Sequence, residues 1–267
     1  MQITIINDCR DENAKLRQVS RTGSLFKNAS VNCNCFGVKS EIEAAGFLVD
    51  AIDAFDGREG IVLANVAPRN GNKISKNKRW KNGTPFGYFW YQKTLIISSV
   101  DGFTLSLVKK LKITKEVFVL DIPRILEEVE LDLSKVKKER IVNSQFRSFD
   151  FLPRTARWLW GERDLPKEKF SLSKIKSVRP TVWFIDNFGN IKTVLLKKEL
   201  NFIDKHSAKI ELDYNGKTIK KILPVYNHLK NLPEGEIGLV EGSSGFENRR
   251  FMEIIINGGN AADHFNI

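Results

Sequence analysis

The sequence predicts two domains: an α/β domain with a mostly parallel sheet and flanking helices, followed by a smaller all-β domain that is barrel-like. In the first half, short apolar runs alternate with segments of helical period. In the second half, strand-like runs are joined by hairpin turns. A stretch rich in Lys and Ser, closed by Arg179-Pro180, separates the two. We therefore expect an N-terminal domain over residues 1–170 and a C-terminal domain over residues 178–267.

The elements of the first half follow in order. Residues 3–6 form an apolar run ending at Asn7-Asp8, which is typical of a buried strand that delivers a carboxylate to a sheet edge. Ser40 followed by Glu43 indicates a capping box, and the helical apolar period that begins there stops at Asp56-Gly57. The remaining elements are strands expected at 60–66, 94–99 and 117–120 and a short helix at 103–111.

The second half is predicted as hairpins. Strands at 181–186 and 191–195 flank a turn at 187–190. Strands at 209–214 and 218–225 flank Asn215-Gly216, the preferred two-residue hairpin turn. Two further strands are expected at 236–240 and 251–257. Together they indicate a small barrel or sandwich.

Composition places the chain among globular proteins. Of its 267 residues, 42% are hydrophobic and 28% charged, and no apolar run approaches the roughly 18 residues of a membrane span. The N-terminus reaches Asp8 too early for a secretory leader. The cysteines Cys9, Cys33 and Cys35 are odd in number and poorly spaced for a disulfide framework, which fits a reducing compartment. We expect a cytoplasmic protein without a membrane partner.

The net charge of +11 raises the question of nucleic acid as a partner. The Lys-rich runs at 73–81, 109–115 and 135–140 are separate, and a solvated face explains each of them. Because zinc-finger spacing and an aromatic RNA-binding signature are missing, we do not expect nucleic acid as a partner. The aromatic strand at 86–91 indicates a core or subunit interface, with base stacking as the alternative. Cys33 and Cys35 alone are too few ligands for zinc, so we expect no metal.

Two C-terminal motifs stand out. Asp186 and Asn190 lie four residues apart across a Gly turn, and an ordinary hairpin turn is the alternative interpretation. Ser243 and Ser244 lie in a Gly-flanked segment, where small residues let backbone approach a ligand and paired hydroxyls bind a carboxylate. The simpler interpretation of this segment and of the Gly-rich stretch at 257–262 is a pair of loops flanking one strand.

In this order and spacing, these motifs resemble the C-terminal domain of the S-adenosylmethionine hydroxide adenosyltransferases, hydrolytic relatives of the fluorinating and chlorinating enzymes. The N-terminal half is similar to the same family more weakly, through the strand ending at Asp8, the strand ending at Val66-Ala67-Pro68 and the turn at 99–102. The resemblance implies a homotrimer that binds S-adenosylmethionine between one subunit's N-terminal domain and a neighbour's C-terminal domain. It implies S-adenosylmethionine as substrate or ligand, with no other cofactor.

The resemblance also implies a role for each matching residue. Asp8 would accept both ribose hydroxyls, while Asn190 and the backbone near Ala261 would read the adenine edge and Tyr226 would stack on its face. Asp186 would pair with the ammonium of the methionine part. Ser243, with Ser244 beside it, would bind the carboxylate.

The sequence departs from the family at its catalytic set, which is an Asp, an Arg and a His in the hydrolytic enzymes. Ala67 stands at the Asp position and Ile74 at the Arg position. Residues 144–149, where the His should lie, contain none; the histidines of the chain are His206, His228 and His264. Asp101 is the candidate replacement base, and Arg69 or Arg147 the candidate cation.

Three functions remain open. The first is cleavage of S-adenosylmethionine at the ribose C5′ by in-line displacement, with water or halide as nucleophile. The second is a binding protein, a sensor or scaffold, that has lost the chemistry. The third is a basic protein associated with nucleic acid. Retention of Asp8, Asp186, Asn190 and Ser243 favours the first two, and we place the enzyme first.

Overall fold

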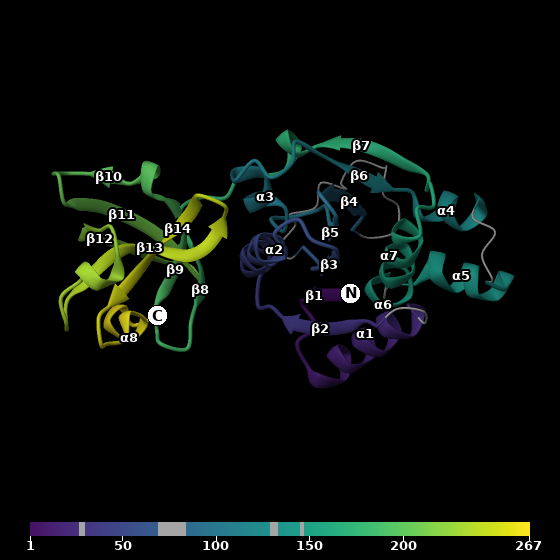
Figure 1. Ribbon diagram of the computed structural model, residues 1–267, viewed down its shortest axis with the longest axis horizontal. Coiled ribbons are helices and arrows are strands. Elements are labelled where there is room, and N and C mark those ends of the chain that lie inside the picture. Colours follow the sequence, from purple (N-terminus) through teal and green to yellow (C-terminus); the bar gives the residue numbers. More distant parts are fainter. Residues whose placement is uncertain (27–29, 69–83, 129–132, 145–146) are drawn as a thin grey trace. The chain divides into compact units, whose positions relative to one another are not determined.

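The computed structural model describes residues 1–26, 30–68, 84–128, 133–144 and 147–267. The chain divides into two compact units, Met1–Lys176 and Ser177–Ile267, each with its own sheet (Figure 1). Among the described residues, no helix is both long enough and apolar enough to cross a membrane. The predicted fold class, an α/β domain followed by a mostly β domain, is confirmed.

The first unit is built on a seven-stranded mixed sheet of order β2-β1-β3-β5-β4-β6-β7. The strands are β1 (Gln2–Asn7), β2 (Asn32–Gly37), β3 (Gly60–Asn65), β4 (Phe86–Tyr91), β5 (Thr94–Ser99), β6 (Glu116–Leu120) and β7 (Lys167–Ser171). Strands β2, β1, β3 and β5 pair in parallel, whereas β4 and β7 run opposite to the other strands. β7 takes up part of the stretch at 166–180 that the sequence predicted to be a linker.

Helices cover both faces of this sheet (Figure 1). They are α1 (Glu12–Leu25), α2 (Glu41–Phe55), α3 (Ser106–Lys110), α4 (Ile122–Glu128), α5 (Lys135–Asn143), α6 (Arg147–Asp150), α7 (Leu152–Trp160) and the 3₁₀ turn η2 (Leu172–Lys174). Ile3 and Ile5 of β1 pack with α7, α4 and α5 in one buried cluster. Ile6, which points to the opposite face, lies in a groove shared with α2.

The start of α2 shows how the sequence sets a boundary. Ser40 Oγ accepts a hydrogen bond from the backbone N–H of Glu43 at 3.1 Å, as the capping-box pattern predicts. The second bond of the capping box differs from the usual pattern. Glu43 Oε2 accepts from the backbone N–H of Lys39 at 2.8 Å, and not from that of the cap residue Ser40. The helix ends at Asp56, whose φ of 52° is left-handed, followed by Gly57. Both predicted ends of this helix are confirmed.

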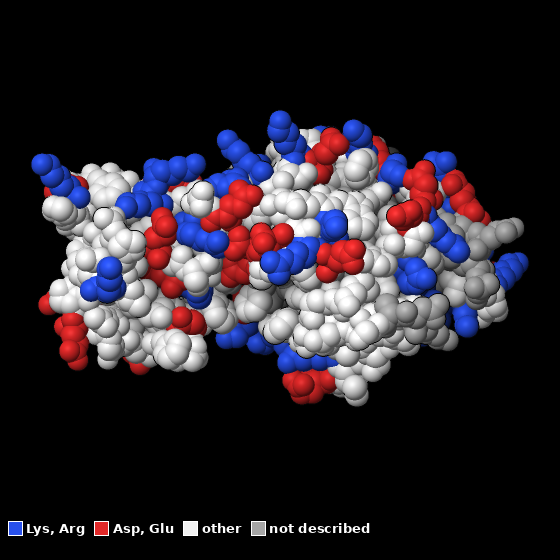
Figure 2. All heavy atoms as spheres, in the orientation of Figure 1, with Lys and Arg blue, Asp and Glu red and all other residues white. Residues whose placement is uncertain are grey.

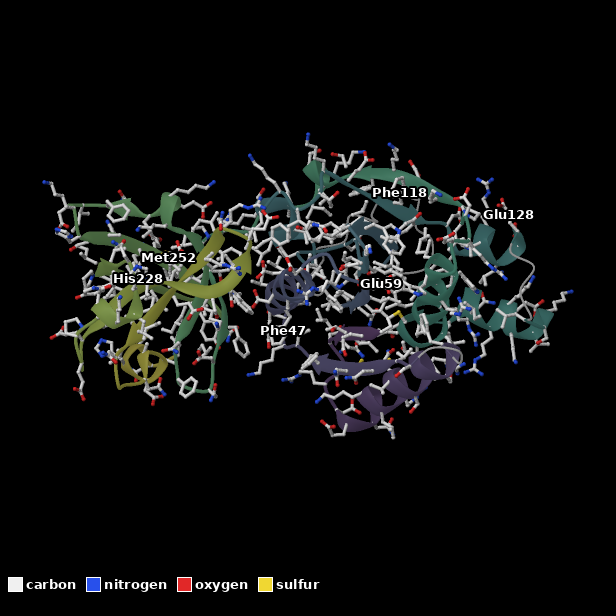
Figure 3. The ribbon with its side chains drawn as sticks, viewed as in Figure 1. Phe47, Glu59, Phe118, Glu128, His228 and Met252 are labelled. Atoms are coloured by element: carbon white, nitrogen blue, oxygen red, sulfur yellow. The ribbon has the colours of Figure 1, made fainter. Side chains whose placement is uncertain are left out.

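The second unit is a seven-stranded sheet of order β10-β11-β12-β13-β14-β9-β8. The strands are β8 (Val182–Ile185), β9 (Ile191–Leu196), β10 (Asn201–Phe202), β11 (Ser207–Tyr214), β12 (Lys217–Tyr226), β13 (Ile237–Phe246) and β14 (Arg249–Ile256); the helical segments are η3 (Lys197–Glu199), η4 (Leu229–Asn231) and α8 (Ala261–Phe265). A parallel bridge from Thr181 to Asp213 links the start of β8 to β11 and curls the sheet into a barrel. Met252 is fully buried in its core (Figure 3).

The turn at Asn215-Gly216 has the predicted chemistry. Both residues have positive φ, 48° and 81°, as a two-residue hairpin turn requires. The alternative interpretation of Ser243 and Ser244 as part of a loop is wrong, because both residues lie within β13. β13 continues through them to Phe246 and pairs with β14 across a bulge between Glu241 and Gly245.

Charges of both signs are interspersed on the face drawn in Figure 2. Blue Lys and Arg side chains lie beside red Asp and Glu side chains over much of that face. In the runs at 109–115 and 135–140, lysines such as Lys112, Lys115 and Lys135 are exposed, as expected of solvated faces, whereas the run at 73–81 lies outside the described residues.

Candidate functional site

Candidate residues of the first unit gather at the carboxyl ends of the parallel strands. Asp8 directly follows β1, and its Oδ2 accepts a hydrogen bond from the backbone N–H of Ala67 at 3.0 Å. Beneath it, Asn65 Nδ2 donates to Asn7 Oδ1 at 3.2 Å. The carboxylate of Asp8 is therefore held between the ends of β1 and β3, half-buried. The Ala67 N–H thus orients this carboxylate at the sheet edge.

Asp101 follows the neighbouring strand β5 but is in a different environment. Its side chain is 0% exposed, and Thr104 and Ser106 beside it along the chain are also buried. A general base must reach the attacking water, so a fully buried carboxylate is poorly placed for that role. The turn itself is tight: Gly102 has φ +79°, and a Cβ there would overlap the carboxylate of Glu41. Glu41 Oε2 also accepts from the backbone N–H of Phe103 at 2.8 Å.

The departures from the family motif are only partly within the described residues. Ala67 lies at the strand end beside Asp8, so a methyl group stands at the position where the resemblance implies a carboxylate. Arg69 and Ile74 lie outside the described residues, as does the side chain of Arg147. Where the His is expected, Ser144 Oγ donates to Asp150 Oδ2 at 3.0 Å.

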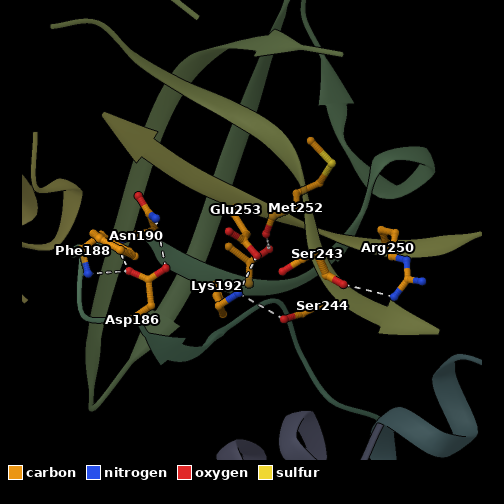
Figure 4. Close-up of polar contacts among 10 residues, drawn as sticks. Asp186, Phe188, Asn190, Lys192, Ser243, Ser244, Arg250, Met252 and Glu253 are labelled. Atoms are coloured by element: carbon orange, nitrogen blue, oxygen red, sulfur yellow. Dashed lines mark hydrogen bonds and ion pairs between the residues drawn. The ribbon is translucent and has the colours of Figure 1, made fainter. Parts of the chain in front are cut away.

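In the second unit, Asp186 organises the turn between β8 and β9 (Figure 4). Its Oδ1 accepts from the backbone N–H groups of Phe188 at 2.9 Å and Asn190 at 3.0 Å. Its Oδ2 accepts from Asn190 Nδ2, also at 3.0 Å. The turn interpretation of this motif is therefore correct. The half-buried carboxylate keeps lone-pair directions for one further cation, so the turn does not exclude ammonium binding.

The β8–β9 turn packs on the Gly-rich C-terminal loop, as the shared assignment of Asn190 and Ala261 to one ligand edge requires. Gly189 O accepts from the backbone N–H of Ala262 at 3.0 Å. A Cβ on Gly189, which has φ +81°, would overlap the side chain of Asn260. Asn260 in turn caps α8 by accepting from the Asp263 N–H at 3.0 Å. Glycine is thus required here for both conformation and space.

An ion pair that sequence reasoning missed lies beside the two serines (Figure 4). Lys192 Nζ is 2.8 Å from Glu253 Oε1 and 3.2 Å from Ser244 Oγ. The side chains of Lys192 and Glu253 are only 13% and 7% exposed. Lys192 comes from β9, next to the Asp186 turn, so it connects that turn to the β13 bulge.

The two serines differ in accessibility. Ser244 is buried, with its hydroxyl engaged by Lys192. Ser243 is exposed, and its backbone carbonyl accepts from Arg250 Nη1 at 3.1 Å. Of the pair, Ser243 is the one whose hydroxyl faces solvent and is open to a ligand carboxylate.

Tyr226 lies in a separate small cluster. It ends β12 and packs with Leu232, Val240 and Ile255. Its ring covers Gly238, where a Cβ would lie 2.7 Å from Tyr226 Cδ2. Another aromatic ring is more open: Phe188, at the tip of the Asp186 turn, is 69% exposed. Sequence reasoning treated Phe188 only as a turn residue, and its exposed ring is large enough for a flat ligand to pack on it.

The comparisons with known proteins bear on this arrangement. Residues 180–267 match the family model described as the SAM hydroxide adenosyltransferase C-terminal domain. The resemblance seen in the sequence is thereby confirmed over that part of the chain. The matched range holds the Asp186 turn, the β13 bulge and the Gly-rich loop.

The whole chain is similar in fold to two solved structures. One is an uncharacterized conserved protein from Thermotoga maritima, with 16% identity over 99% of this chain and 96% of that chain, at a TM-score of 0.60. The other is a conserved hypothetical protein from Thermus thermophilus, with 14% identity over 100% of this chain and 95% of that chain, at a TM-score of 0.57. At these identities the likeness shows the fold alone. No match to a curated protein was found.

Proposed function

We propose that this chain, whose residues 180–267 match the S-adenosylmethionine hydroxide adenosyltransferase C-terminal domain, binds S-adenosylmethionine and cleaves it at the ribose C5′. The observation that carries the proposal is this match together with the contact between the Asp186 turn and the Gly-rich loop. Because of that contact, Asn190 lies near the backbone of Ala261 and Ala262, which supports a shared surface for the adenine edge.

The remaining contacts are assigned by chemistry. Asp8 would accept the ribose hydroxyls, because the Ala67 N–H orients its half-buried carboxylate at the ends of β1 and β3. Asp186 would accept the ammonium, and the exposed Ser243 hydroxyl would donate to the carboxylate. Tyr226 and the more exposed Phe188 are the candidate stacking rings.

In the reaction, the C5′–S bond breaks and its electron pair goes to sulfur, which releases neutral methionine thioether. Because sulfonium is already charged, the leaving group needs no proton. If water attacks, the new C5′–O bond leaves a proton that a base must take. If a halide attacks, no proton is released.

The described residues supply no accessible base near Asp8 in the family position. Ala67 replaces the Asp, and Asp101 is buried. Residues 69–83, which follow that strand end, contain no Asp, Glu or His. We therefore propose that any hydrolysis is slow, since general-base help contributes about a hundred- to ten-thousand-fold. Displacement by halide is not subject to this penalty.

The same observations favour a second candidate, a protein that binds S-adenosylmethionine without turning it over. In that case the Asp186 turn and Asp8 would act in recognition alone. The two candidates share every binding residue and differ only in product formation.

The deciding experiment is incubation of the purified protein with S-adenosylmethionine, with and without chloride, followed by mass spectrometry and calorimetry. Methionine with adenosine indicates hydrolysis, and methionine with a 5′-haloadenosine indicates halide attack. Binding without either product establishes the second candidate. Absence of both binding and products would overturn the proposal.

We also propose that the protein is a homotrimer, on the family resemblance. Light scattering should then give about three times the 30.5 kDa of one chain. A stable monomer that binds S-adenosylmethionine tightly would contradict this assembly.

A further inference from the structure

Four arginines that form no ion pair within the described residues lie on two helices of the first unit that pack together. Arg17 and Arg21 lie on α1, and Arg154 and Arg157 lie on α7, which packs against α1 (Figure 1). Within the described residues, none of the four is within ion-pair distance of a carboxylate. The sole acidic residue of these two helices, Glu12, is paired with Lys15 at 2.8 Å.

Two of these guanidinium groups share one aromatic ring, and a third lies over another. The Cζ atoms of Arg17 and Arg21 each lie 4.5 Å from the centroid of Phe149, and Arg157 lies 5.9 Å from that of Phe26. Arg154 is half-buried, and its Nε is buried without a hydrogen-bond partner among the described atoms. Burial and the charge of Arg21 lower the pKa of Arg154, against the opposing effect of Asp150.

Such an arrangement is costly without an anion. Like charges repel, and a buried guanidinium N–H without an acceptor loses hydration without replacement. Asp150 is the carboxylate that raises the pKa of Arg154, but it already accepts a hydrogen bond from Ser144 at 3.0 Å and lies 4.0 Å from Arg140. Planar guanidinium groups fit the paired oxygens of phosphate. The cluster therefore favours a ligand with several phosphate groups.

Aromatic side chains continue the same helix. Trp160, three residues beyond Arg157 on α7, stacks on Trp90 of β4 at a centroid distance of 5.8 Å and an interplanar angle of 27°. Trp90 is 44% exposed, and both rings line an open cavity of about 710 Å³ together with Arg163. Acidic side chains also line this cavity. Attraction for phosphate groups therefore comes from the arginines, whereas the Trp pair supplies a flat apolar surface.

We propose that the arginine cluster and the Trp90–Trp160 pair together form a binding surface for single-stranded nucleic acid. Arginines next to exposed aromatic rings are the combination that holds phosphates while bases stack. Arg157 and Trp160 are three residues apart on α7, so they are neighbours on the surface of that helix and connect the arginines to the Trp pair. None of these arginines and tryptophans is among the residues assigned to S-adenosylmethionine, and the arginines are not part of the Lys-rich runs.

The test is fluorescence anisotropy with a labelled oligothymidylate as probe, titrated over a range of salt concentrations. The variant Arg17→Gln/Arg21→Gln/Arg157→Gln should bind about tenfold to a hundredfold more weakly, with the salt slope smaller by about two. The control Lys205→Gln/Lys209→Gln/Lys230→Gln removes the same charge from exposed positions of the barrel and should lose much less. Equal losses in both variants, or no loss in the first, would overturn the proposal.

A second pair of variants tests the aromatic part. Trp90→Leu should weaken binding about tenfold by loss of stacking, whereas Phe202→Leu, at a 43% exposed ring on β10, should not. Binding to vesicles containing anionic lipid in preference to the oligonucleotide would also overturn the proposal. Calorimetry with S-adenosylmethionine on the same variants should give wild-type affinity, which separates this surface from the proposed reaction site.

Discussion

Asn190 donates its side-chain amide to Oδ2 of Asp186 at 3.0 Å, while Oδ1 of the same carboxylate accepts from the backbone of the turn. Asp186 thus closes the β8–β9 turn and is also the residue proposed to bind the ligand ammonium. The two roles can be separated, because the backbone bonds need an oxygen acceptor whereas the ammonium needs a negative charge.

Asp186→Asn should therefore weaken S-adenosylmethionine binding by about 1.5–3 kcal/mol, the range for a lost charged hydrogen bond, while the domain stays folded. Calorimetry measures the affinity, and circular dichroism checks the fold. Asp204→Asn is the matched control, since Asp204 Oδ1 likewise accepts backbone N–H groups, from His206 at 2.7 Å and Ser207 at 2.6 Å. Equal affinity in both variants would contradict the ammonium assignment.

Cys9 offers a chemical probe of the ribose assignment, because it is exposed and directly follows Asp8. Saturating S-adenosylmethionine should slow alkylation of Cys9 by iodoacetamide severalfold if the ribose lies on Asp8. Peptide mass spectrometry follows each cysteine separately. In Asp8→Asn this protection should be lost at the same ligand concentration, and protection that persists there would contradict the assignment.

Cys35 serves as the internal reference. Burial raises the pKa of its thiol to about 11, with nearby Lys15 opposing the shift. Because the thiolate is the reactive form, Cys35 should react far more slowly than Cys9 at pH 8 and accelerate as pH rises toward 11. Folding stability should fall over the same alkaline range, since the unfolded thiol ionises near pH 8.5 while the folded thiol stays neutral. Ligand should leave the Cys35 rate unchanged.

Asp101→Asn should lower stability rather than activity. The side chain is fully buried in the turn after β5, so exchanging a carboxylate oxygen for an N–H₂ donor in that enclosed space should cost about 1–3 kcal/mol of unfolding free energy. The rate of any S-adenosylmethionine hydrolysis per folded molecule should stay unchanged. Loss of that rate at wild-type affinity and stability would instead identify Asp101 as the base.

Breaking the Lys192–Glu253 ion pair should destabilise the domain far more than breaking an exposed ion pair. Lys192→Met leaves Glu253 buried without a partner, which costs about 3–5 kcal/mol. Lys220→Met removes the partner of Glu211, 2.9 Å away, where the side chains are 60% and 57% exposed; this should change stability by at most about 1 kcal/mol. Urea unfolding of both variants gives the comparison. Similar losses would mean that burial of the inner pair has no energetic effect.

The sequence predicted those elements whose signal is local. Ser40 and Glu43 marked a helix start through side chain–backbone bonds within one turn, and Asn215-Gly216 fixed a hairpin through backbone conformation alone. Helix α1 was missed because its apolar residues are few, and Leu16 among them is 64% exposed. Strand β2 was missed because it is an edge strand, although Cys33 and Cys35 alternate with Asn in a strand period.

From the sequence, only those site residues could be predicted that lie close together along the chain. Asp186 and Asn190 were found because they share one turn. The pairing of Lys192 with Glu253 depends on the register of β9 against β14, which composition does not reveal. The burial of Asp101 likewise depends on how α2 and its Glu41 cover the turn after β5.

The bridge from Thr181 to Asp213 has a consequence for cutting the chain. Thr181 precedes β8, and Pro180 O accepts from the Asp213 N–H at 3.1 Å, so the barrel is closed by residues outside its first strand. A fragment that begins at Val182 would leave β8 and β11 with unpaired backbone groups along their open sides. Exposed strand edges pair with strands of other molecules, so the fragment that begins at Val182 should associate edge to edge. A fragment that begins at Ser177 keeps Pro180 and Thr181, which pair with Asp213, and should not associate in this way.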